Sequence, residues 1–462
     1  MSEGNSQFES THFAGDYRLG KVEILTSSGK KIDMSNLVVE MNIYESILRP
    51  NMEGNLVILD SHNHIDNLPI IGQEQISFKL HRPGINMESI DFETHRGRIY
   101  KIDSIVKTRE REKSYMVHFT TTDAYRNAHT RVSRAYAGTI SDICSKILKN
   151  ELGVKKSILT ENTSELTKYV GSFKRPFELI NQLVKKATSP RHGHGYLFFE
   201  NHRGYNIRSL GSLTHTQDGK PKLPVAQFNE GLVDREGGLK DIELDMKTMR
   251  SVQIKGTHDT NADLRAGGLA IKHYIHDTYK KSVSTTSYNY LKEYDDEKHT
   301  DENSNPLYSN TFEDINTKKS VSDYDESRIM VSPNSTFLHD SVANIGTHNV
   351  NKSRNHARRI MYDTLKLSAV VAGHSEIAAG DVVELLINAR QPVEKEGDTV
   401  ESKKLSGRWL VNSLVHTVTK NEYTITMDCT KDSVAEPYDS QDESIDSMFS
   451  PSNETSTNTA ID

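Results

Sequence analysis

The sequence predicts a mainly β protein of the α+β class, in which two small β domains enclose an α+β domain and a polar insertion. Near both ends of the chain, apolar residues recur at every second position, and Gly, Pro and Asn separate these stretches. Between the two β regions, apolar residues recur at helical spacing. The chain has 462 residues, which is enough for about three or four domains.

Alternating apolar residues indicate the strands of the N-terminal region, residues 17–120. Turn-forming residues at 27–30, 49–51 and 82–84 separate them. Five or more short strands without a helical pattern between them predict a small barrel or sandwich. The alternating sets are Val39, Met41 and Ile43; Ile76, Phe78 and Leu80; and Tyr115, Val117 and Phe119.

Two helices are predicted next. Thr139 and Asp142 form a capping box, and the apolar stripe that follows stops at Gly153, a suitable residue just beyond a helix end. Pro176 suits the first turn of a second helix, which we expect to end at Ser189-Pro190. The apolar stripe of the first helix consists of Ile140, Ile143, Ile147, Leu148 and Leu152.

A hairpin follows the second helix. The apolar stretches 196–199 and 205–207 flank Asn-His-Arg-Gly at 201–204, which is typical of a hairpin turn. We therefore expect a compact α+β domain over residues 126–215.

Residues 216–350 connect this domain to the second β domain. Within them, 282–336 is rich in Ser, Asp, Asn, Thr and Tyr and poor in aliphatic residues, which predicts an extended polar insertion.

Strand patterns return in residues 351–432. After an amphipathic segment, apolar residues alternate over 365–371, and a Gly380-Asp381 turn precedes a strand at 382–386. Two further strands, 408–415 and 423–427, face each other across Lys420-Asn421. These elements predict the second β domain.

Cysteine usage and hydropathy indicate the environment of the chain. Cys144 and Cys429 belong to no metal-binding or redox motif, so we expect two buried thiols. No apolar run approaches the roughly 18 residues of a membrane span, and residues 1–15 lack the pattern of a signal peptide. We therefore expect folding in a reducing cytoplasm and no membrane insertion.

The formal net charge of −7 resides in the C-terminal segment. Residues 433–462 contain seven acids and no Lys or Arg, and we expect them to form an acidic, disordered tail. The rest of the chain is then close to neutral. Tight binding of duplex DNA is not expected, because phosphate affinity depends on clustered Lys and Arg.

One candidate metal motif is the His62/His64 pair, which lies near Asp60 and Asp66. The pair precedes a loop that offers no complete ligand set, so we expect a polar turn and no bound metal. His192 and His194 repeat the spacing between glycines, where a loop that enters the following strand is at least as favoured.

Other catalytic patterns are weak. Gly373-His374-Ser375-Glu376-Ile377 lacks the final Gly of a nucleophile elbow. No glycine-rich phosphate loop is present, and Asp295-Asp296 lies in the polar insertion, where solvent would keep both carboxylates ionised. We therefore predict no catalytic, cofactor-binding or metal-binding residues, no cofactor and no enzymatic activity.

Three stretches, taken in order, carry a family resemblance. The first comprises two expected strands, 36–47 and 55–60, followed by 72–76, which begins with Gly-Gln-Glu. The second is an expected helix and hairpin at 175–180 and 195–199, and the third is the set of closing strands at 379–384, 407–411 and 423–429. In this order they resemble the baseplate central hub proteins of contractile-tailed bacteriophages, a superfamily that includes secretion spikes.

The resemblance implies a fold and an assembly. Residues 1–125, completed by 238–256, would form a first tube-type β-barrel domain, and 351–432 a second similar one. In a homotrimer, the paired barrels would form a pseudo-sixfold ring that adapts a threefold central spike to the sixfold tail tube. The ring would enclose a polar channel through which DNA passes.

The resemblance also implies partners and a location. The partners would be the central spike protein, the tail tube protein and the baseplate wedge proteins, in the tail baseplate of a virion assembled in the host cytoplasm. Two alternatives stay open: a component similar to a type VI secretion spike, and a tail-associated metal-dependent hydrolase that uses the paired histidines. The absence of a β-helix repeat favours the hub over the spike.

Overall fold

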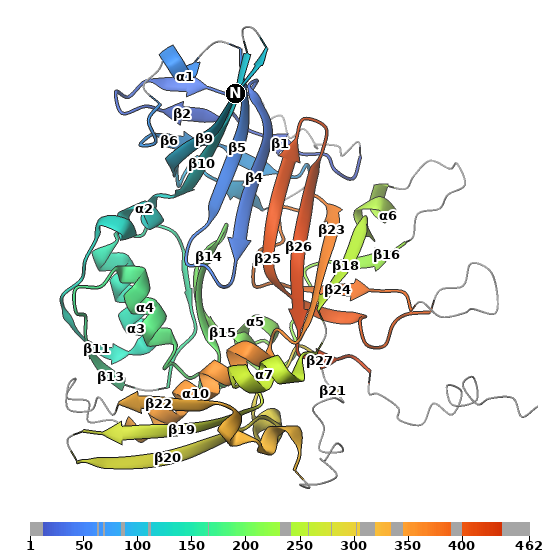
Figure 1. Cartoon of the computed structure of the whole chain (residues 1–462). Helices are drawn as coiled ribbons and strands as arrows, with labels where there is room; N and C mark the ends of the chain where they lie inside the picture. Colours follow the sequence, from blue (N-terminus) through green and yellow to red (C-terminus); the bar gives the residue numbers. More distant parts are fainter. Residues whose placement is uncertain are drawn as a thin grey trace, which may run out of the picture.

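One sheet of 14 strands dominates the computed structural model, and strands from the two ends of the chain lie side by side in it (Figure 1). The structure describes residues 13–61, 64–67, 70–84, 88–109, 112–164, 166–231, 242–256, 258–278, 280–301, 303–304, 319–333, 345–389 and 400–436.

The N-terminal strands cross this sheet in the order β4, β5, β10, β9, β6, β2, β3. The predicted alternation is confirmed, because all three residues of the sets around Phe78 and Val117 are buried. In the third set Met41 and Ile43 are buried, whereas an irregularity in pairing after Val38 leaves Val39 half-buried. The bounds are β2 Glu23–Leu25, β3 Lys31–Asp33, β4 Val38–Ser46, β5 Glu53–Asp60, β6 Gln75–Ser77, β9 Gly97–Arg109 and β10 Glu112–Thr121; β1 (Arg18–Leu19), β7 (Lys79–His81) and β8 (Ser89–Asp91) form a small second sheet, and α1 is His64–Asn67.

The two β regions join through β4 and β25 (Gly407–Thr419), which pair antiparallel from Ser46 with Ser413 to Glu40 with Thr419. One apolar core continues across this seam, from Ile43 to Trp409. The mainly β fold is confirmed, but the pairing among the described strands closes no barrel, so the two tube-type barrel domains stay a prediction.

The C-terminal part of the sheet contains the predicted strands β23 (Leu365–Ala372), β24 (Val382–Leu386) and β26 (Tyr423–Lys431). The hairpin of β25 and β26 is confirmed. β18 (Ser251–Gly256) pairs with β23, so the described part of 238–256 does not complete the N-terminal region as expected. The remaining strands are β16 (Gln227–Glu230), which pairs with β24, and β17 (Thr248–Met249), preceded by α6 (Ile242–Met246).

The α+β region has its own apolar core. The Thr139 hydroxyl accepts a hydrogen bond from the Asp142 N–H at 3.2 Å, and Gly153 has a φ of +64°, which confirms both predicted helix signals. The second helix begins at Pro176 as predicted but ends at Val184, earlier than expected. The elements are α2 Thr122–His129, β11 Ala135–Thr139, α3 Ile140–Lys146 with a π-helical turn Ile147–Glu151, β12 Ile158–Thr160, β13 Leu166–Val170, α4 Pro176–Val184, β14 Tyr196–Asn201, β15 Gly204–Ser209 and α5 Leu210–Thr214.

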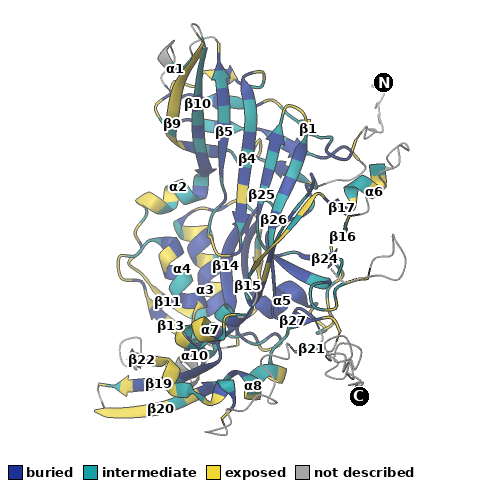
Figure 2. Cartoon of the chain, turned by 45° about the vertical axis from the view of Figure 1, so that its right-hand side comes forward, coloured by how far each residue is buried: buried dark blue, intermediate teal, exposed yellow. Residues whose placement is uncertain are grey.

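The polar insertion, for which the sequence leaves the degree of order open, contains regular structure. β20 (Ser282–Asn289) pairs antiparallel and β22 (Ile329–Pro333) pairs parallel with β19 (Ala270–Asp277). Figure 2 shows much of β20 exposed, so these strands need few aliphatic residues. The neighbouring helices are α7 (Thr260–Ala266), α8 (Tyr290–Glu293) and α10 (Ile345–Met361).

The predicted acidic tail begins later than expected. Ser433 and Val434 are buried and form β27, which pairs with β21 (Asn303–Ser304); residues 437–462 lie outside the described residues. Both cysteines are buried and free, as predicted. Among the described helices, none has the length and apolar character that a membrane crossing requires.

Candidate functional site: buried junctions around one hairpin

The hairpin β14–β15 lies at the centre of the molecule and is covered on both faces. Every residue of its two strands is buried except Arg208, which is half-buried. Phe198 and Tyr205 pack in the core of the α+β region, whereas Leu197 and Phe199 pack with C-terminal residues such as Leu410. The alternation of a strand thus places this hairpin between two cores.

Glu45, near the end of β4, binds the turn of this hairpin. One carboxylate oxygen accepts hydrogen bonds from the backbone N–H and from Nδ1 of His202, both at 2.9 Å. The other oxygen accepts the backbone N–H of Ala379 at 3.0 Å. One carboxylate therefore connects the N-terminal sheet, the hairpin turn and the loop before β24.

The electrostatics of this contact indicate an ion pair. Burial opposes ionisation of Glu45, but the charge and hydrogen bond of His202 lower the pKa of the carboxyl group to about 2. Burial likewise opposes protonation of His202, but Glu45 and then Glu88 raise its pKa to about 9. Near neutral pH both groups are charged.

Arg203, the next turn residue, extends this network. Its Nε donates to Glu88 at 2.7 Å and its Nη1 donates to Asp381 at 2.8 Å. Asp381 in turn accepts the N–H of Ala378 at 2.9 Å, which fixes the turn before β24. Arg203 therefore binds one group from the N-terminal region and one from the C-terminal region.

Glu200, on the other side of the turn, is a hairpin carboxylate that binds groups outside the hairpin. Its carboxylate accepts hydrogen bonds from Lys156 Nζ at 2.6 Å, the Thr121 hydroxyl at 2.8 Å and the backbone N–H of Met52 at 3.2 Å. Glu200 is fully buried. The hairpin thus binds the large sheet through two carboxylates, one from each side of the contact.

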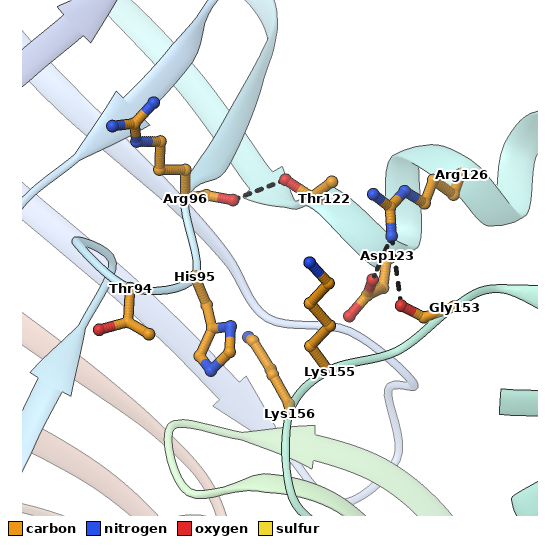
Figure 3. A pocket seen from close by; sticks show the side chains of 9 residues that line it. All are labelled: Thr94, His95, Arg96, Thr122, Asp123, Arg126, Gly153, Lys155 and Lys156. Carbon is orange, nitrogen blue, oxygen red and sulfur yellow. Dashed lines mark hydrogen bonds and ion pairs between the residues drawn. The ribbon is translucent and has the colours of Figure 1, made fainter. Parts of the chain in front are cut away.

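A cavity of about 140 Å³ lies beside this junction. Lys155, Lys156 and Asp123 are among the side chains that line it (Figure 3). Asp123 lies 3.6 Å from Arg126. Burial, followed by the charge of Glu200, raises the pKa of Asp123 to about 6.

Glu45, His202 and His416 lie close enough together to be considered as metal ligands. Among the described residues, this is the one such group of three. Nε2 of His416 lies 3.9 Å from the Glu45 carboxylate, and its Nδ1 is 2.7 Å from the Tyr423 hydroxyl. The potential ligand atoms all lie within 4.8 Å of one another, but Nδ1 of His202 is already engaged with the Glu45 carboxylate at 2.9 Å. The geometry favours an ion pair with a neutral neighbour, because burial lowers the pKa of His416 to about 4.

The structure does not bring His192 and His194 together as ligands of one ion. His192 binds Glu161 at 2.7 Å and the carbonyl of Thr216 at 2.9 Å. His194 binds Glu297 at 2.5 Å. Both side chains therefore serve structural contacts in different directions.

The remaining sequence candidates are in part outside the described residues. His62 and the side chain of Asp66 are not described, His64 lies in α1, and Asp60 is buried. The Ser375 hydroxyl is buried and accepts the backbone N–H of Arg82 at 3.3 Å.

A second charged junction lies where the insertion meets the sheet. Arg358 of α10 binds Asp432 at 2.5 Å, and His299 binds the same carboxylate at 2.8 Å. Lys431 lies 3.4 Å from Asp301. No sign of these contacts is visible in the sequence, because a segment rich in polar residues is usually exposed to solvent. The partners are also far apart in the chain.

This chain is similar to known phage tail proteins. No protein-family model matches the chain. A probable baseplate hub protein of Vibrio phage KVP40 is 23% identical over 424 residues, which cover 87% of this chain and 91% of that protein. The chain is a relative of the phage baseplate hub proteins.

Two solved structures share the fold of this hub relative. A tail protein from Neisseria meningitidis MC58 superposes with a TM-score of 0.53 at 10% identity, covering 90% of this chain and 97% of the other. The 43 kDa tail protein of prophage MuSo2 from Shewanella oneidensis gives a TM-score of 0.51 at 11% identity, covering 90% and 100%. The likeness extends over nearly the whole of each tail protein.

Glu45→Gln should lower the free energy of unfolding by about 3 to 5 kcal/mol, because it leaves the buried His202 imidazolium without its counter-ion. Glu53→Gln on β5 is the matched control, since Glu53 pairs with Arg49 at an exposed position, where an ion pair contributes about 1 kcal/mol or less. Denaturant titration measures both. Equal losses for the two variants would contradict the account.

Stability should also depend on pH through this pair. Because the pKa of His202 is raised from 6.5 to about 9, its contribution is complete below pH 6.5 and is lost as the pH rises through 9. Because the pKa of Glu45 is lowered from 4.5 to about 2, its contribution is complete above pH 4.5 and is lost as the pH falls through 2. His202→Gln should therefore remove about 3 kcal/mol of the alkaline decline.

The control is His276→Gln, on the exposed side of β19, which should leave the alkaline decline of the wild type unchanged. Unfolding free energies measured from pH 5.5 to 9.5 decide the matter. An alkaline decline that persists unaltered in His202→Gln would refute the assignment of a charged His202.

Proposed function

We propose that this chain is the structural hub of a phage tail baseplate and acts as a homotrimer. The observation that carries the proposal is the relationship to a probable baseplate hub protein over 87% of this chain and 91% of that protein. A match over nearly both full lengths favours the same overall role more strongly than a match of one domain.

The form of the sheet supports a ring. Each chain contributes two β regions joined at the β4–β25 seam, so three chains related by a threefold axis place six β regions around it. Among the described strands, β18 pairs only with β23 and β3 only with β2, which leaves an unpaired side on each. Unpaired strand edges invite pairing with another chain.

In this arrangement the threefold face meets the central spike protein and the pseudo-sixfold face meets the tail tube protein, with baseplate wedge proteins outside. DNA crosses a central channel without being held, because the chain without its acidic C-terminal segment has almost no net charge. The virion baseplate is the resulting location.

The contacts of the candidate catalytic residues support a structural role without catalysis. His192 and His194 are engaged with carboxylates of the same chain, and the Ser375 hydroxyl is buried. Each of these groups contributes to the positions of neighbouring elements.

Multi-angle light scattering at micromolar concentration should give a mass three times that of the chain. Ile254→Lys should lower this mass, because Ile254 is 50% exposed on the edge strand β18 and a charge there opposes pairing. Val283→Lys is the matched control, since Val283 is 60% exposed on β20 and should leave the trimer intact.

A monomer that forms no larger species even when a spike partner is added would contradict the trimer. A trimer unaffected by Ile254→Lys would contradict the β18 contact and leave the trimer itself standing.

A further inference from the structure

A polar cavity of about 570 Å³ lies beside the hairpin, between β12, β15 and the residues that follow α5. Arg191, Arg208 and Lys222 line it, with Glu161 as its acidic residue. Its rim includes Leu159, which is 42% exposed. The cavity is thus a basic pocket with an apolar margin.

The part of the chain that the structure describes offsets the positive charge of this pocket only in part, through the nearby charges of Glu161 and Asp381. Arg208 and Lys222 both donate to the backbone carbonyl of Ser212, each at 2.6 Å. The carboxylate of Glu161 is occupied by Nδ1 of His192 and by the N–H of Ser209, each at 2.7 Å. The described carboxylates form no ion pair with the three cations.

Burial makes this concentration of charge unfavourable without an anion. Burial, followed by the charge of Arg208, lowers the pKa of Lys222 to about 8. A bound carboxylate would offset this effect, because an opposite charge favours the protonated amine.

The sequence of the chain contains a suitable anionic segment. Residues 437–462 contain six acids and no Lys, Arg or His. They come after β27 and Ala435, whose carbonyl accepts a hydrogen bond from the Asn303 side chain at 2.8 Å. Arg408 donates to the carbonyl of Thr300, three residues before β21, and to the carbonyl of Thr214, each at 2.8 Å. Thr214 directly precedes His215 in the pocket wall.

We propose that this pocket is a carboxylate-binding site and that the acidic segment 437–462 of the same chain occupies it. The 26 residues of this segment can extend over roughly 85 Å, so the pocket is within reach. Ile445, Met448 and Phe449 supply apolar side chains for the margin near Leu159. Partners that approach this face then meet a pocket already filled by carboxylates.

Distance measurement between two spin labels tests the proposal in the full chain. Labels are placed at Ser444→Cys in the acidic segment and at Gln217→Cys on the exposed wall of the pocket; the native cysteines are fully buried and do not react. Double electron–electron resonance should give a narrow distribution of short distances. Arg191→Gln, an exposed change that preserves the fold, should broaden it, as should high salt.

Lys220→Gln is the matched control, because Lys220 is exposed two residues from Lys222 and should leave the distribution narrow. A broad distribution in the wild type, or one that Arg191→Gln does not change, would overturn the proposal. Short distances that vanish when labelled chains are diluted with unlabelled ones would also overturn it, because the segment would then occupy the pocket of another copy.

Discussion

The structure depends on the ion pair between Glu45 and His202, which holds a buried hairpin turn against the end of β4. Both side chains are at most 2% exposed. Burying two charges is unfavourable unless hydrogen bonds replace their hydration. Glu45 meets this condition, because it accepts three hydrogen bonds at 2.9 to 3.0 Å from the turn and from Ala379.

This requirement explains why three regions of the chain keep one arrangement. A slipped strand or a shifted hairpin would leave a charge buried without its partner, which is strongly unfavourable. Glu200 imposes the same condition from the hairpin side through Lys156, Thr121 and Met52. The continuous core across β4 and β25 adds apolar packing to these contacts, so the two β regions and the hairpin form one body.

Local patterns in the sequence predicted much of the fold. The alternation around Phe78 and Val117, the helix signals at Thr139 and Pro176, and the hairpin after 408 follow from rules that act within a few residues. The family resemblance arose from the same segments. The predicted end of the second helix at Ser189-Pro190 was wrong, because the helix ends at Val184, where its apolar stripe stops.

Long-range pairing lies beyond such rules. The pairing of β4 with β25, and of β18 with β23, depends on which strand edges meet after folding. The strands of the insertion escaped notice because Ser and Thr occupy their exposed sides. In the sequence, Glu45 and His202 look like ordinary polar residues. Their contact is strong only because both side chains are buried, and the sequence does not show this burial.

Hydrogen–deuterium exchange of the hairpin amides tests the central claim most directly. If the buried ion pairs join the hairpin to both β regions, amides of residues 196–201 and 204–209 should exchange as slowly as those of β25 and β26, and only through global unfolding. Faster exchange of the hairpin, at a rate similar to that of the exposed β20, would show that it opens on its own and would contradict the account.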